Sequence, residues 1–414
     1  MSERFTEAEV ARCADQLAGS IGDGDRIMVA TGSGEPPLLI AGMLEAADRI
    51  DARLEILQVM TGSRGGIFAG ERRHRYLVPV PGRHSIIEYC DILPSSMAQM
   101  ANAIRSGELR IDGVLFASTV IDDEGLAPAL CVDLVPAALQ AARFRATEIN
   151  ARLPRVLTDA RLERAHCEVV VEHDSEPPVL DGGSSDETTR RIGANVAEII
   201  TDGSTLELGI GAALSGVADA LVHRDASLAI HTGLISDWLI PLVDAGVAER
   251  PLACARGLPV VASVAMGSRE FYHWLASTSQ VLLAPTEHAH DPQHLMGLDT
   301  FVAVNSASFV DLSGQVGVPT KGADLRPVGG LLDFAIAGAY RHGSVIALRS
   351  LDRAGDSRIV PSLPAAQITG SLVTHVVTEH GIAQLAGRTW AERRRELISV
   401  ADPDHRAWLH AQAP

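Results

Sequence analysis

Apolar residues along this chain fall into short runs typical of buried strands and longer stretches with helical spacing. Residues 5–21 place apolar side chains at helical intervals, and the apolar run within 25–32 leads into a glycine turn. A helix is expected from Pro36 and Pro37, because proline is favoured in the first helical turn, and another apolar run follows at 54–60. Strands that alternate with helices in this way predict a parallel sheet covered by helices.

The same order of elements starts again in the second half of the chain, after a segment with the composition of a linker. Residues 172–191 concentrate proline, glycine, serine and acidic residues without periodicity. An apolar run at 205–211 ends in glycines and begins a second series of strands. The later apolar runs are 228–231, 260–266, 280–285, 301–307 and 344–350. The pattern therefore predicts two similar open α/β domains, residues 1–180 and 181–414.

The composition is that of an acidic globular protein. The chain has 414 residues, 46% of them hydrophobic, and 35 basic against 52 acidic side chains give a net charge of −17. This charge repels nucleic-acid backbones and anionic membranes, and 4 Trp, 4 Tyr and 8 Phe provide few stacking surfaces for bases. We therefore expect a small-molecule partner, with no nucleic acid and no membrane.

The cysteines argue against both a disulfide framework and a structural zinc site. Their number is odd and no Cys-x-x-Cys pair occurs; they stand at positions 13, 90, 131, 167 and 254. No stretch reaches 18 consecutive apolar residues, and the charged N-terminus lacks the apolar region of a signal peptide. We expect a cytoplasmic protein without a metal ion. A serine or cysteine hydrolase has little support, since Gly-x-Ser-x-Gly is absent and Cys254 has no patterned partner.

Two glycine turns bring backbone N–H groups into consideration as ligand contacts. Gly209 and Gly211 follow an apolar run and precede a helical stretch, the arrangement in which N–H groups can face a phosphate. Leu214 occupies the place of the third glycine of a dinucleotide fingerprint, so a tight turn is the better explanation of the pattern. Gly329 and Gly330 allow either a close approach to a ligand or a left-handed turn.

Residues 285–294 carry a dense group of ionisable side chains. They are Glu287, His288, His290, Asp291 and His294. The spacing fits no helical pair of metal ligands, and Pro292 favours a loop. A solvated loop is the first expectation, acid/base catalysis the second and a zinc site the third.

Several motifs occur in an order that spans most of the chain. They are Gly-Ser-Gly-Glu-Pro-Pro-Leu-Leu at 32–39, Asp-Asp-Glu-Gly-Leu-Ala-Pro at 122–128, Leu-Glu-Leu-Gly-Ile-Gly-Ala at 206–212, Asn-Ser-Ala followed by Val-Asp-Leu-Ser-Gly-Gln-Val within 305–316, and the C-terminal segment 376–409. Together they resemble the acetyl-CoA hydrolase/4-hydroxybutyrate CoA-transferase family, a branch of the class I CoA-transferases.

The resemblance implies a fold, a substrate and an assembly. The fold would be two CoA-transferase-like α/β domains with the active-site cleft between them, and the protein would form a homodimer or homotetramer. Coenzyme A would bind as the acyl-CoA substrate, with Gly209, Gly211 and Asn305 in contact with it. The backbone of Gly329 and Gly330 would contact the thioester carbonyl.

Two positions depart from the pattern of the family. The resemblance places the catalytic glutamate, which becomes an acyl anhydride and then a glutamyl-CoA thioester, at Phe309. A phenyl ring cannot attack a thioester. Leu331 stands where the family carries glutamine, so both side chains are expected to line an apolar acyl pocket.

Three hypotheses for the function fit the sequence. The first is an acyl-CoA-processing enzyme that hydrolyses a thioester, or cleaves a carbon–carbon bond or ring, without a glutamyl intermediate. The second is a CoA-transferase in which a nearby carboxylate such as Asp311 is the nucleophile. The third is a catalytically silent protein that binds CoA thioesters.

The first hypothesis requires an acid/base residue from another segment. Glu35, in the Gly-Glu-Pro turn, is one candidate, although a carboxylate that only stabilises a helix start fits equally well. Glu287, His288 and His290 are the others, because they precede the strand that leads to residue 309. Glu379 resembles a family residue that we expect to be structural.

Overall fold

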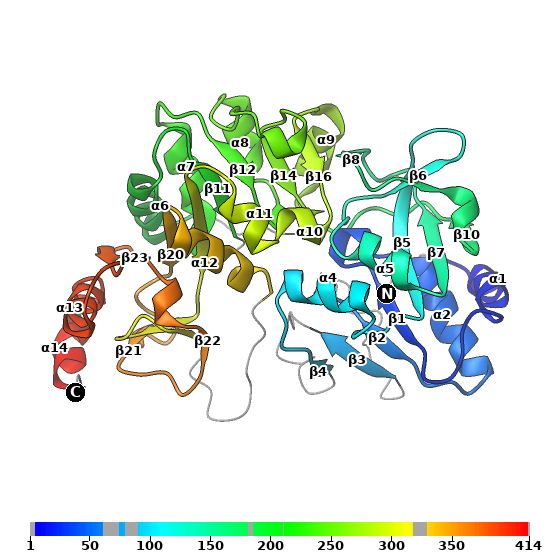
Figure 1. Cartoon of the computed structure of the whole chain (residues 1–414), viewed down its shortest axis with the longest axis horizontal. Helices are drawn as coiled ribbons and strands as arrows, with labels where there is room; N and C mark the ends of the chain where they lie inside the picture. Colours follow the sequence, from blue (N-terminus) through cyan, green and yellow to red (C-terminus); the bar gives the residue numbers. More distant parts are fainter. Residues whose placement is uncertain are drawn as a thin grey trace. The chain divides into compact units, whose positions relative to one another are not determined.

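The chain divides into two compact units, each containing a predominantly parallel sheet (Figure 1). The computed structural model describes residues 5–60, 74–78, 90–180, 185–209, 211–317 and 329–412. The first unit comprises Met1–Leu180 and Ala262–His288, and the second comprises Asp181–Val261 and Ala289–Pro414. These units differ from a linear division of the chain between residues 180 and 181, because residues 262–288 belong to the first unit.

The first strand along the chain lies at the centre of the sheet of the first unit, and the later strands lie on both sides of it. Its strands lie in the order β10 (Val169–Glu172), β7 (Phe144–Ile149), β5 (Gly113–Val120), β1 (Arg26–Val29), β2 (Glu55–Leu57), β3 (Arg75–Val78) and β4 (Cys90–Ile92). The chain runs from β1 outwards to β4, returns to the other side of β1 at β5, and then continues outwards to β10. The change of direction between β1 and β5 is a topological switch point.

Alternating side chains of these strands fill two apolar layers. Ile27 and Val29 pack with α1 (Glu7–Leu17) and α2 (Pro37–Arg49). Met28, between them, faces the other way and packs with α4 (Met97–Ser106) and α5 (Val135–Ala141). Because both faces are covered, the strands are apolar almost throughout, as the sequence pattern predicts.

Residues 262–288 complete the first unit through backbone hydrogen bonds. Ala265 N–H, in β15 (Val264–Ala265), donates to Leu130 O at 2.8 Å, and Thr286 N–H donates to Asp133 O at 2.9 Å. After α9 (Arg269–Ser277), β16 (Val281–Leu283) pairs in parallel with β8 (Leu157–Thr158). This segment joins the first unit through pairing with residues that are remote in sequence, so the local sequence pattern could not assign it to that unit.

The second unit has a similar arrangement of strands, with its first strand inside the sheet and later strands on both sides. Its strands lie in the order β24 (Gly381–Gln384), β23 (His375–Thr378), β20 (Gly343–Ala347), β17 (Phe301–Ser306), β11 (Thr205–Leu208), β12 (Ala229–His231) and β14 (Val260–Ala262). The chain runs from β11 to β14, returns beside β11 at β17 and continues outwards to β23. The switch point of this unit therefore lies between β11 and β17.

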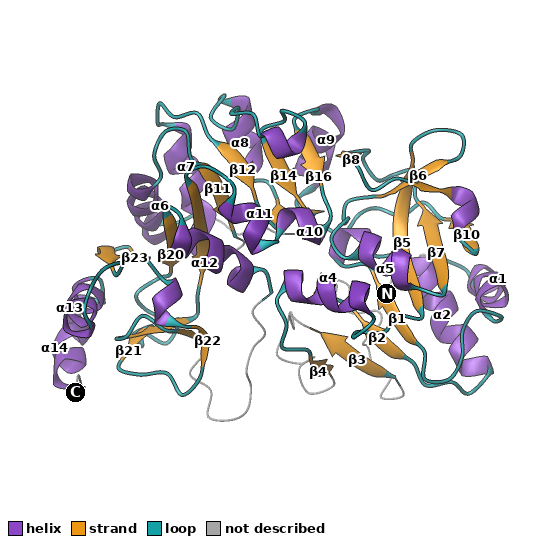
Figure 2. Ribbon diagram, in the orientation of Figure 1, coloured by secondary structure: helices purple, strands orange, loops and turns teal. Residues whose placement is uncertain are grey.

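Helices and strands alternate along the second unit as they do along the first (Figure 2). Its helices are α6 (Glu187–Ile199), α7 (Ser215–Val222), α8 (Leu239–Asp244), α11 (Pro292–Met296), α12 (Leu331–Tyr340), α13 (Trp390–Ser399) and α14 (Pro403–Gln412). Phe301 and Ala303 of β17 pack with Leu295 of α11 and Phe334 of α12.

A smaller sheet accompanies the C-terminal helices. It contains β21 (Ile359–Val360), β18 (Phe309–Asp311), β19 (Val316–Gly317) and β22 (Ala366–Ile368). Val310 and Ile359 share an apolar cluster with Leu397 of α13 and Leu409 of α14. The motif-rich segments 305–316 and 376–409 thus belong to one structural subregion.

The predicted fold class, two α/β domains with predominantly parallel sheets, is confirmed. The active-site cleft expected between the two halves stays a prediction. None of the helices in the described ranges combines the length and the apolar character needed to cross a membrane.

Candidate functional site

The glycine turn after β11 and the Asn-Ser pair at the end of β17 lie side by side in the second unit. The two strands are parallel neighbours, with Leu208 opposite Val304, and Gly209 N–H donates to Val304 O at 2.9 Å. A β-carbon added to Gly209 would lie 2.8 Å from Oδ1 of Asn305. Ligands of open parallel sheets bind at the carboxyl edge beside the switch point, which is where these residues meet. Ile210 lies outside the described residues.

A buried carboxyl group supports this edge from within the sheet. Glu207 is 1% exposed, and its Oε2 accepts a hydrogen bond of 2.6 Å from Nδ2 of Asn305. Burial raises the pKa of Glu207 to about 8, against the smaller opposing effect of the Asn305 hydrogen bond. Sequence analysis overlooked this residue, although an acidic side chain inside the apolar run Thr-Leu-Glu-Leu was the available signal.

The imidazole of His290 lies against the backbone of two glycines in the same unit. A β-carbon at Gly233, just after β12, would lie 2.8 Å from Cε1 of His290, and one at Gly330 would lie 2.7 Å from that atom. Both distances are shorter than any ordinary carbon contact, so any side chain at these positions would displace the ring. Gly330 is the N-cap residue of α12, and Gly329 before it has φ +52°, a left-handed conformation that favours glycine.

His290 also faces an acidic and an aromatic side chain of α12. Its Nδ1 lies 3.9 Å from Oδ2 of Asp333, and its ring centroid lies 4.8 Å from that of Phe334. Within the described part of the chain, Nδ1 has no hydrogen-bond partner. Burial lowers the pKa of His290 to about 3, so its imidazole is neutral at pH 7.

Most of segment 285–294 is helical and part of it is buried, so the expectation of a solvated loop is wrong. It forms α10 (Thr286–Ala289) and α11, with the side chain of Asp291 capping α11 by accepting a hydrogen bond from Gln293 N–H. Thr286 and His290 are buried, because apolar packing against the sheets outweighs the local preference for a turn. The ionisable residues of this segment suggested that it is exposed to solvent, but tertiary packing buries part of it.

The acid/base candidates of this segment have separate environments. Glu287, in the first unit, forms an ion pair with Arg105 of α4, with Nε and Oε1 2.6 Å apart. His288 is half-buried on α10. Of the three candidates, His290 is the one packed against the glycines and Asp333 of the second unit.

Asp311, the alternative nucleophile, is fully engaged in a turn. Its two oxygens accept five hydrogen bonds, from the N–H and Oγ of Ser313, the N–H and Nε2 of Gln315, and the N–H of Leu363. The side chain is 2% exposed. These contacts stabilise the β18–β19 turn, and the role of Asp311 as an alternative nucleophile stays a prediction.

Phe309 and Leu331 occupy different settings in the second unit. Phe309 is half-buried at the start of β18 and pairs with Gly317 of β19. Leu331 begins α12 and packs against the cluster that contains Val310. The apolar acyl pocket expected from these side chains stays a prediction, as does the assignment of Phe309 to the position of the nucleophile.

Glu35, in the first unit, does not cap the helix that follows it. Its Oε1 accepts a hydrogen bond of 2.8 Å from Nε2 of Gln58, at the end of β2. The N–H groups of Leu38 and Leu39 in the first turn of α2 instead donate to Oε2 of Glu148, at 2.8 and 3.1 Å. A residue remote in sequence thus caps α2, whereas the interpretation of Glu35 as a carboxylate near the helix start stays a prediction.

A second buried carboxyl group in the first unit follows Cys131. Asp133 is 2% exposed, and its Oδ2 lies 3.6 Å from the Cys131 thiol. Burial raises the pKa of Asp133 to about 7, and the negative charge of Glu287 adds to this shift. A short loop before α5 gave no sequence signal for its burial.

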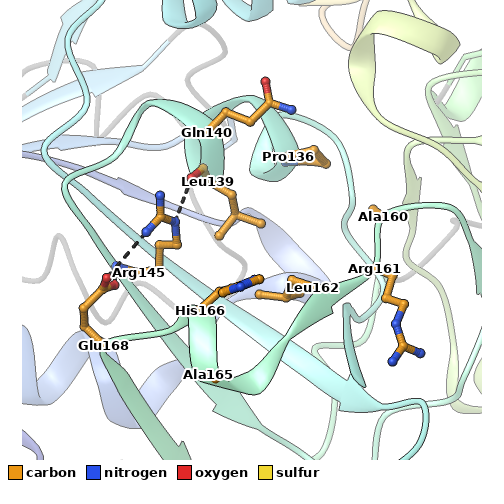
Figure 3. A pocket seen from close by; sticks show the side chains of 10 residues that line it. All are labelled: Pro136, Leu139, Gln140, Arg145, Ala160, Arg161, Leu162, Ala165, His166 and Glu168. Atoms are coloured by element: carbon orange, nitrogen blue, oxygen red, sulfur yellow. Dashed lines mark hydrogen bonds and ion pairs between the residues drawn. The ribbon is translucent and has the colours of Figure 1, made fainter. Parts of the chain in front are cut away.

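Figure 3 shows the residues that line a cavity of about 530 Å³ in the first unit. Its lining includes Arg145, at the amino end of β7, and Glu168, just before β10. The side-chain Nε of Arg145 donates to Leu139 O at 2.7 Å, and the backbone N–H of Arg145 donates to Glu168 Oε2 at 2.6 Å. Ligands of parallel sheets bind at the carboxyl ends of the strands, so this cavity at the amino ends is a poor candidate for the catalytic site.

Glu379, which we expect to be structural, contacts the segment that follows β20. Its Oε2 accepts a hydrogen bond of 3.0 Å from the N–H of Ser350, and its Oε1 accepts one of 2.7 Å from the Ser350 hydroxyl. Both oxygens thus fix the segment that follows β20.

The fold defines an α/β protein with a candidate ligand site at a topological switch point, and similar proteins point to a family. Residues 267–413 match the acetyl-CoA hydrolase/transferase C-terminal domain. The 4-hydroxybutyrate coenzyme A transferase of Clostridium kluyveri is 28% identical over 410 residues, which cover 96% of this chain and 95% of that protein. A probable butyrate:acetyl-CoA coenzyme A-transferase of Syntrophomonas wolfei is 31% identical over 291 residues, 67% of this chain and 65% of that protein.

Solved structures agree on the fold. RipA from Yersinia pestis superposes with a TM-score of 0.88 at 23% identity, covering 98% of both chains. The 4-hydroxybutyrate CoA-transferase from Porphyromonas gingivalis gives a TM-score of 0.80 at 22% identity, covering 98% of this chain and 99% of that one. The resemblance to the acetyl-CoA hydrolase/4-hydroxybutyrate CoA-transferase family is confirmed by the matched C-terminal domain and by relatives named 4-hydroxybutyrate coenzyme A transferase and acetyl-CoA hydrolase.

Proposed function

We propose that this chain binds an acyl-CoA at the carboxyl edge of the second sheet and cleaves it without a glutamyl-CoA intermediate. The observation that carries the proposal is the meeting of the Gly209 turn with Asn305 at the switch point between β11 and β17. In this proposal Gly209, Gly211 and Asn305 contact the pantetheine or phosphate portion of CoA. The backbone at Gly329 and Gly330, where α12 begins, contacts the thioester carbonyl.

The environments of the carboxyl groups of Asp311 and Glu207 support cleavage by water over covalent catalysis. Asp311 has its oxygens occupied by five hydrogen bonds, and Glu207 is buried beneath Asn305 with a pKa of about 8. A protonated, buried carboxyl group is a poor nucleophile. Hydrolysis of the thioester, or cleavage of a carbon–carbon bond or ring in the acyl group, is the reaction class that this arrangement favours.

His290 is the proposed acid/base residue. In this proposal the imidazole, which is neutral at pH 7, accepts a proton from the attacking water, and Oδ2 of Asp333 lies 3.9 Å from its Nδ1. The proton is then available for the departing CoA thiolate. The His290 ring lies beside Gly330, so in this proposal the proton transfer takes place next to the backbone that binds the thioester carbonyl.

CoA transfer to a carboxylic acid is the second candidate, because the relatives from Clostridium kluyveri and Syntrophomonas wolfei carry transferase names. The purified protein is mixed with a panel of acyl-CoA substrates, with and without acetate or succinate. Free acid formed without an acceptor supports the proposal, and exchanged thioester formed only with an acceptor supports transfer. Neither product, with CoA binding detected by calorimetry, identifies a silent CoA-binding protein.

Two further measurements separate the mechanisms. Incubation with acyl-CoA is expected to leave no covalent CoA adduct by mass spectrometry, and borohydride is expected not to inactivate the protein. An adduct on any residue of 305–316 would restore the glutamyl-type mechanism. The variant H290Q is expected to lower turnover about 100-fold or more, whereas E35Q, E287Q and H288Q serve as comparisons for the other candidate bases. An unchanged rate in H290Q removes the assignment.

We also propose a cytoplasmic location. The five cysteines are free thiols in the structure, as is usual for proteins of a reducing compartment. Fractionation of cells that express the chain tests this location.

A further inference from the structure

Three potential metal ligands from separate segments converge in the second unit. His231 ends β12, Cys254 lies in a single 3₁₀ turn at Ala253–Ala255, and His294 lies on α11. One ligand atom from each lies within 4.8 Å of the others. The two imidazole rings are 5.6 Å apart between centroids and are tilted by 44°. In the ranges that the structure describes, this is the one group of histidine, cysteine and acidic side chains so closely gathered.

The ligand atoms are slightly further apart than in an occupied site. Metal–nitrogen bonds of about 2.0 Å and metal–sulfur bonds of about 2.3 Å place tetrahedral ligands about 3.3–3.6 Å from one another. The present spread of up to 4.8 Å therefore needs a contraction of roughly 1 Å, which small side-chain rotations provide.

The backbone around each ligand is fixed by local hydrogen bonds. His231 pairs with Val261 of β14. The turn with Cys254 is closed on both sides, because Leu252 N–H donates to Leu258 O and Gly257 N–H donates to Leu252 O. Fixed backbones reduce the entropy lost when the ligands are ordered around an ion.

The burial and the chemistry of the three side chains point to one class of ion. His231 is fully buried, whereas Cys254 and His294 are half-buried, so an ion held between them would keep access to solvent. Imidazole and thiolate ligands favour zinc and related transition metals, and Mg²⁺ and Ca²⁺ prefer oxygen. Sites with three protein ligands leave a fourth position for water or substrate.

We propose that His231, Cys254 and His294 bind one divalent transition-metal ion, of which Zn²⁺ is the expected example. Binding forms two metal–nitrogen bonds and one metal–sulfur bond, and the thiol proton of Cys254 passes to solvent. The ligands are 23 and 40 residues apart along the chain, so no sequence motif reveals them. The test of this site measures metal binding alone, so its outcome does not depend on the reaction proposed above.

Cobalt is the probe for the test. The full-length protein is treated with a chelator, separated from it and titrated with Co²⁺. One equivalent is expected to bind and to produce the visible bands of tetrahedral cobalt together with a thiolate-to-cobalt charge-transfer band in the near ultraviolet. Zn²⁺ is expected to displace the cobalt and to raise the melting temperature of the wild-type protein.

Matched variants locate the ion. C254S is expected to lose the charge-transfer band, and H294A to weaken cobalt binding at least tenfold. C90S and H410A, which change the same residue types elsewhere, are expected to bind cobalt as the wild type does. Circular dichroism and thermal melts establish that each variant is folded.

The cobalt titration of the wild-type protein tests the proposed metal site even where a variant fails to fold. Folded wild-type protein that binds no cobalt, or binds it without a thiolate band, contradicts the proposal. Retention of the thiolate band in folded C254S, or its loss in C90S, would place the ion elsewhere and would also contradict it.

Discussion

Buried carboxyl groups are the side chains whose roles changed most between sequence and structure. Glu207, Glu148 and Asp133 are each nearly inaccessible, and burial raises the pKa of each. In the sequence they look like isolated acids within or beside apolar runs. Local pattern cannot distinguish an acid at a strand end in solvent from one covered by a remote segment, because the covering residues are about 100 positions away for Glu148 and Glu207.

Replacement of Glu207 by glutamine is expected to change the dependence of stability on pH. Between about pH 4.5 and 8 the folded protein retains a proton on Glu207 that the unfolded chain releases, so this group lowers stability as pH rises through that interval. Glutamine has no such titration and still accepts the hydrogen bond from Asn305.

Thermal melts at pH 5 and pH 8 measure this effect. The melting temperature of E207Q relative to wild type is expected to be higher at pH 8 than at pH 5. An equal difference at the two pH values would mean that the pKa of Glu207 is close to its ordinary value.

Replacement of Gly330 by alanine tests the contact with His290. The new β-carbon would lie 2.7 Å from Cε1 of His290 and 3.1 Å from Phe334, so the ring must move. Overpacking of this kind costs about 1–3 kcal/mol of the free energy of unfolding. Urea denaturation measures the change.

Gly19 is the control glycine for this substitution, because a β-carbon there meets no atom within 4 Å. G19A is expected to stay within about 0.5 kcal/mol of wild type. A G330A protein as stable as G19A, with unchanged activity, would show that His290 is not confined as described.

The helices and strands could be predicted from the sequence, whereas the pairing of the strands with one another could not. Apolar runs such as 205–211 and 301–307 contain β11 and β17, because a strand covered on both faces is apolar along its length. The strand order depends on pairing between residues such as Leu208 and Val304, for which a single sequence contains no signal. In the candidate site, Gly209 and Asn305 were foreseen, but the burial of His290 between Gly233 and Gly330 required the fold.

Replacement of Glu148 by alanine tests the capping of α2 from within the sheet. The change leaves the N–H groups of Leu38 and Leu39 without their acceptor in a buried position. An unpaired buried donor costs about 1–3 kcal/mol, so urea denaturation is expected to show a loss of that size. E148Q retains a carbonyl acceptor and is expected to lose less. Equal stability of E148A and wild type would contradict the capping role.

The whole molecule requires residues 262–288 for its first unit. A fragment that ends at residue 180 lacks the segment that pairs with Leu130, Asp133 and Leu157. We expect this fragment to show poor protection in amide hydrogen exchange and no cooperative thermal transition. A fragment of 1–180 that melts cooperatively near the temperature of the full chain would contradict this dependence.

Assembly is a further property of the whole molecule. The resemblance to CoA-transferases leads us to expect a homodimer or homotetramer. Light scattering of the purified protein at several concentrations is expected to give two or four times the mass of one chain. The mass of a single chain throughout would contradict the expectation.

The return of residues 262–288 to the first unit also imposes an order on events at the ribosome. Domains usually fold during synthesis from the N-terminus, at about 5–20 residues per second. Here β15, α9 and β16 emerge only after β11, β12 and β14 have been made. The N-terminal half must therefore wait, with its Leu130–Asp133 loop unpaired, while about 80 further residues are translated. Slow translation or rare codons between 181 and 261 would lengthen the period in which a chaperone, or another nascent chain, can bind that exposed loop.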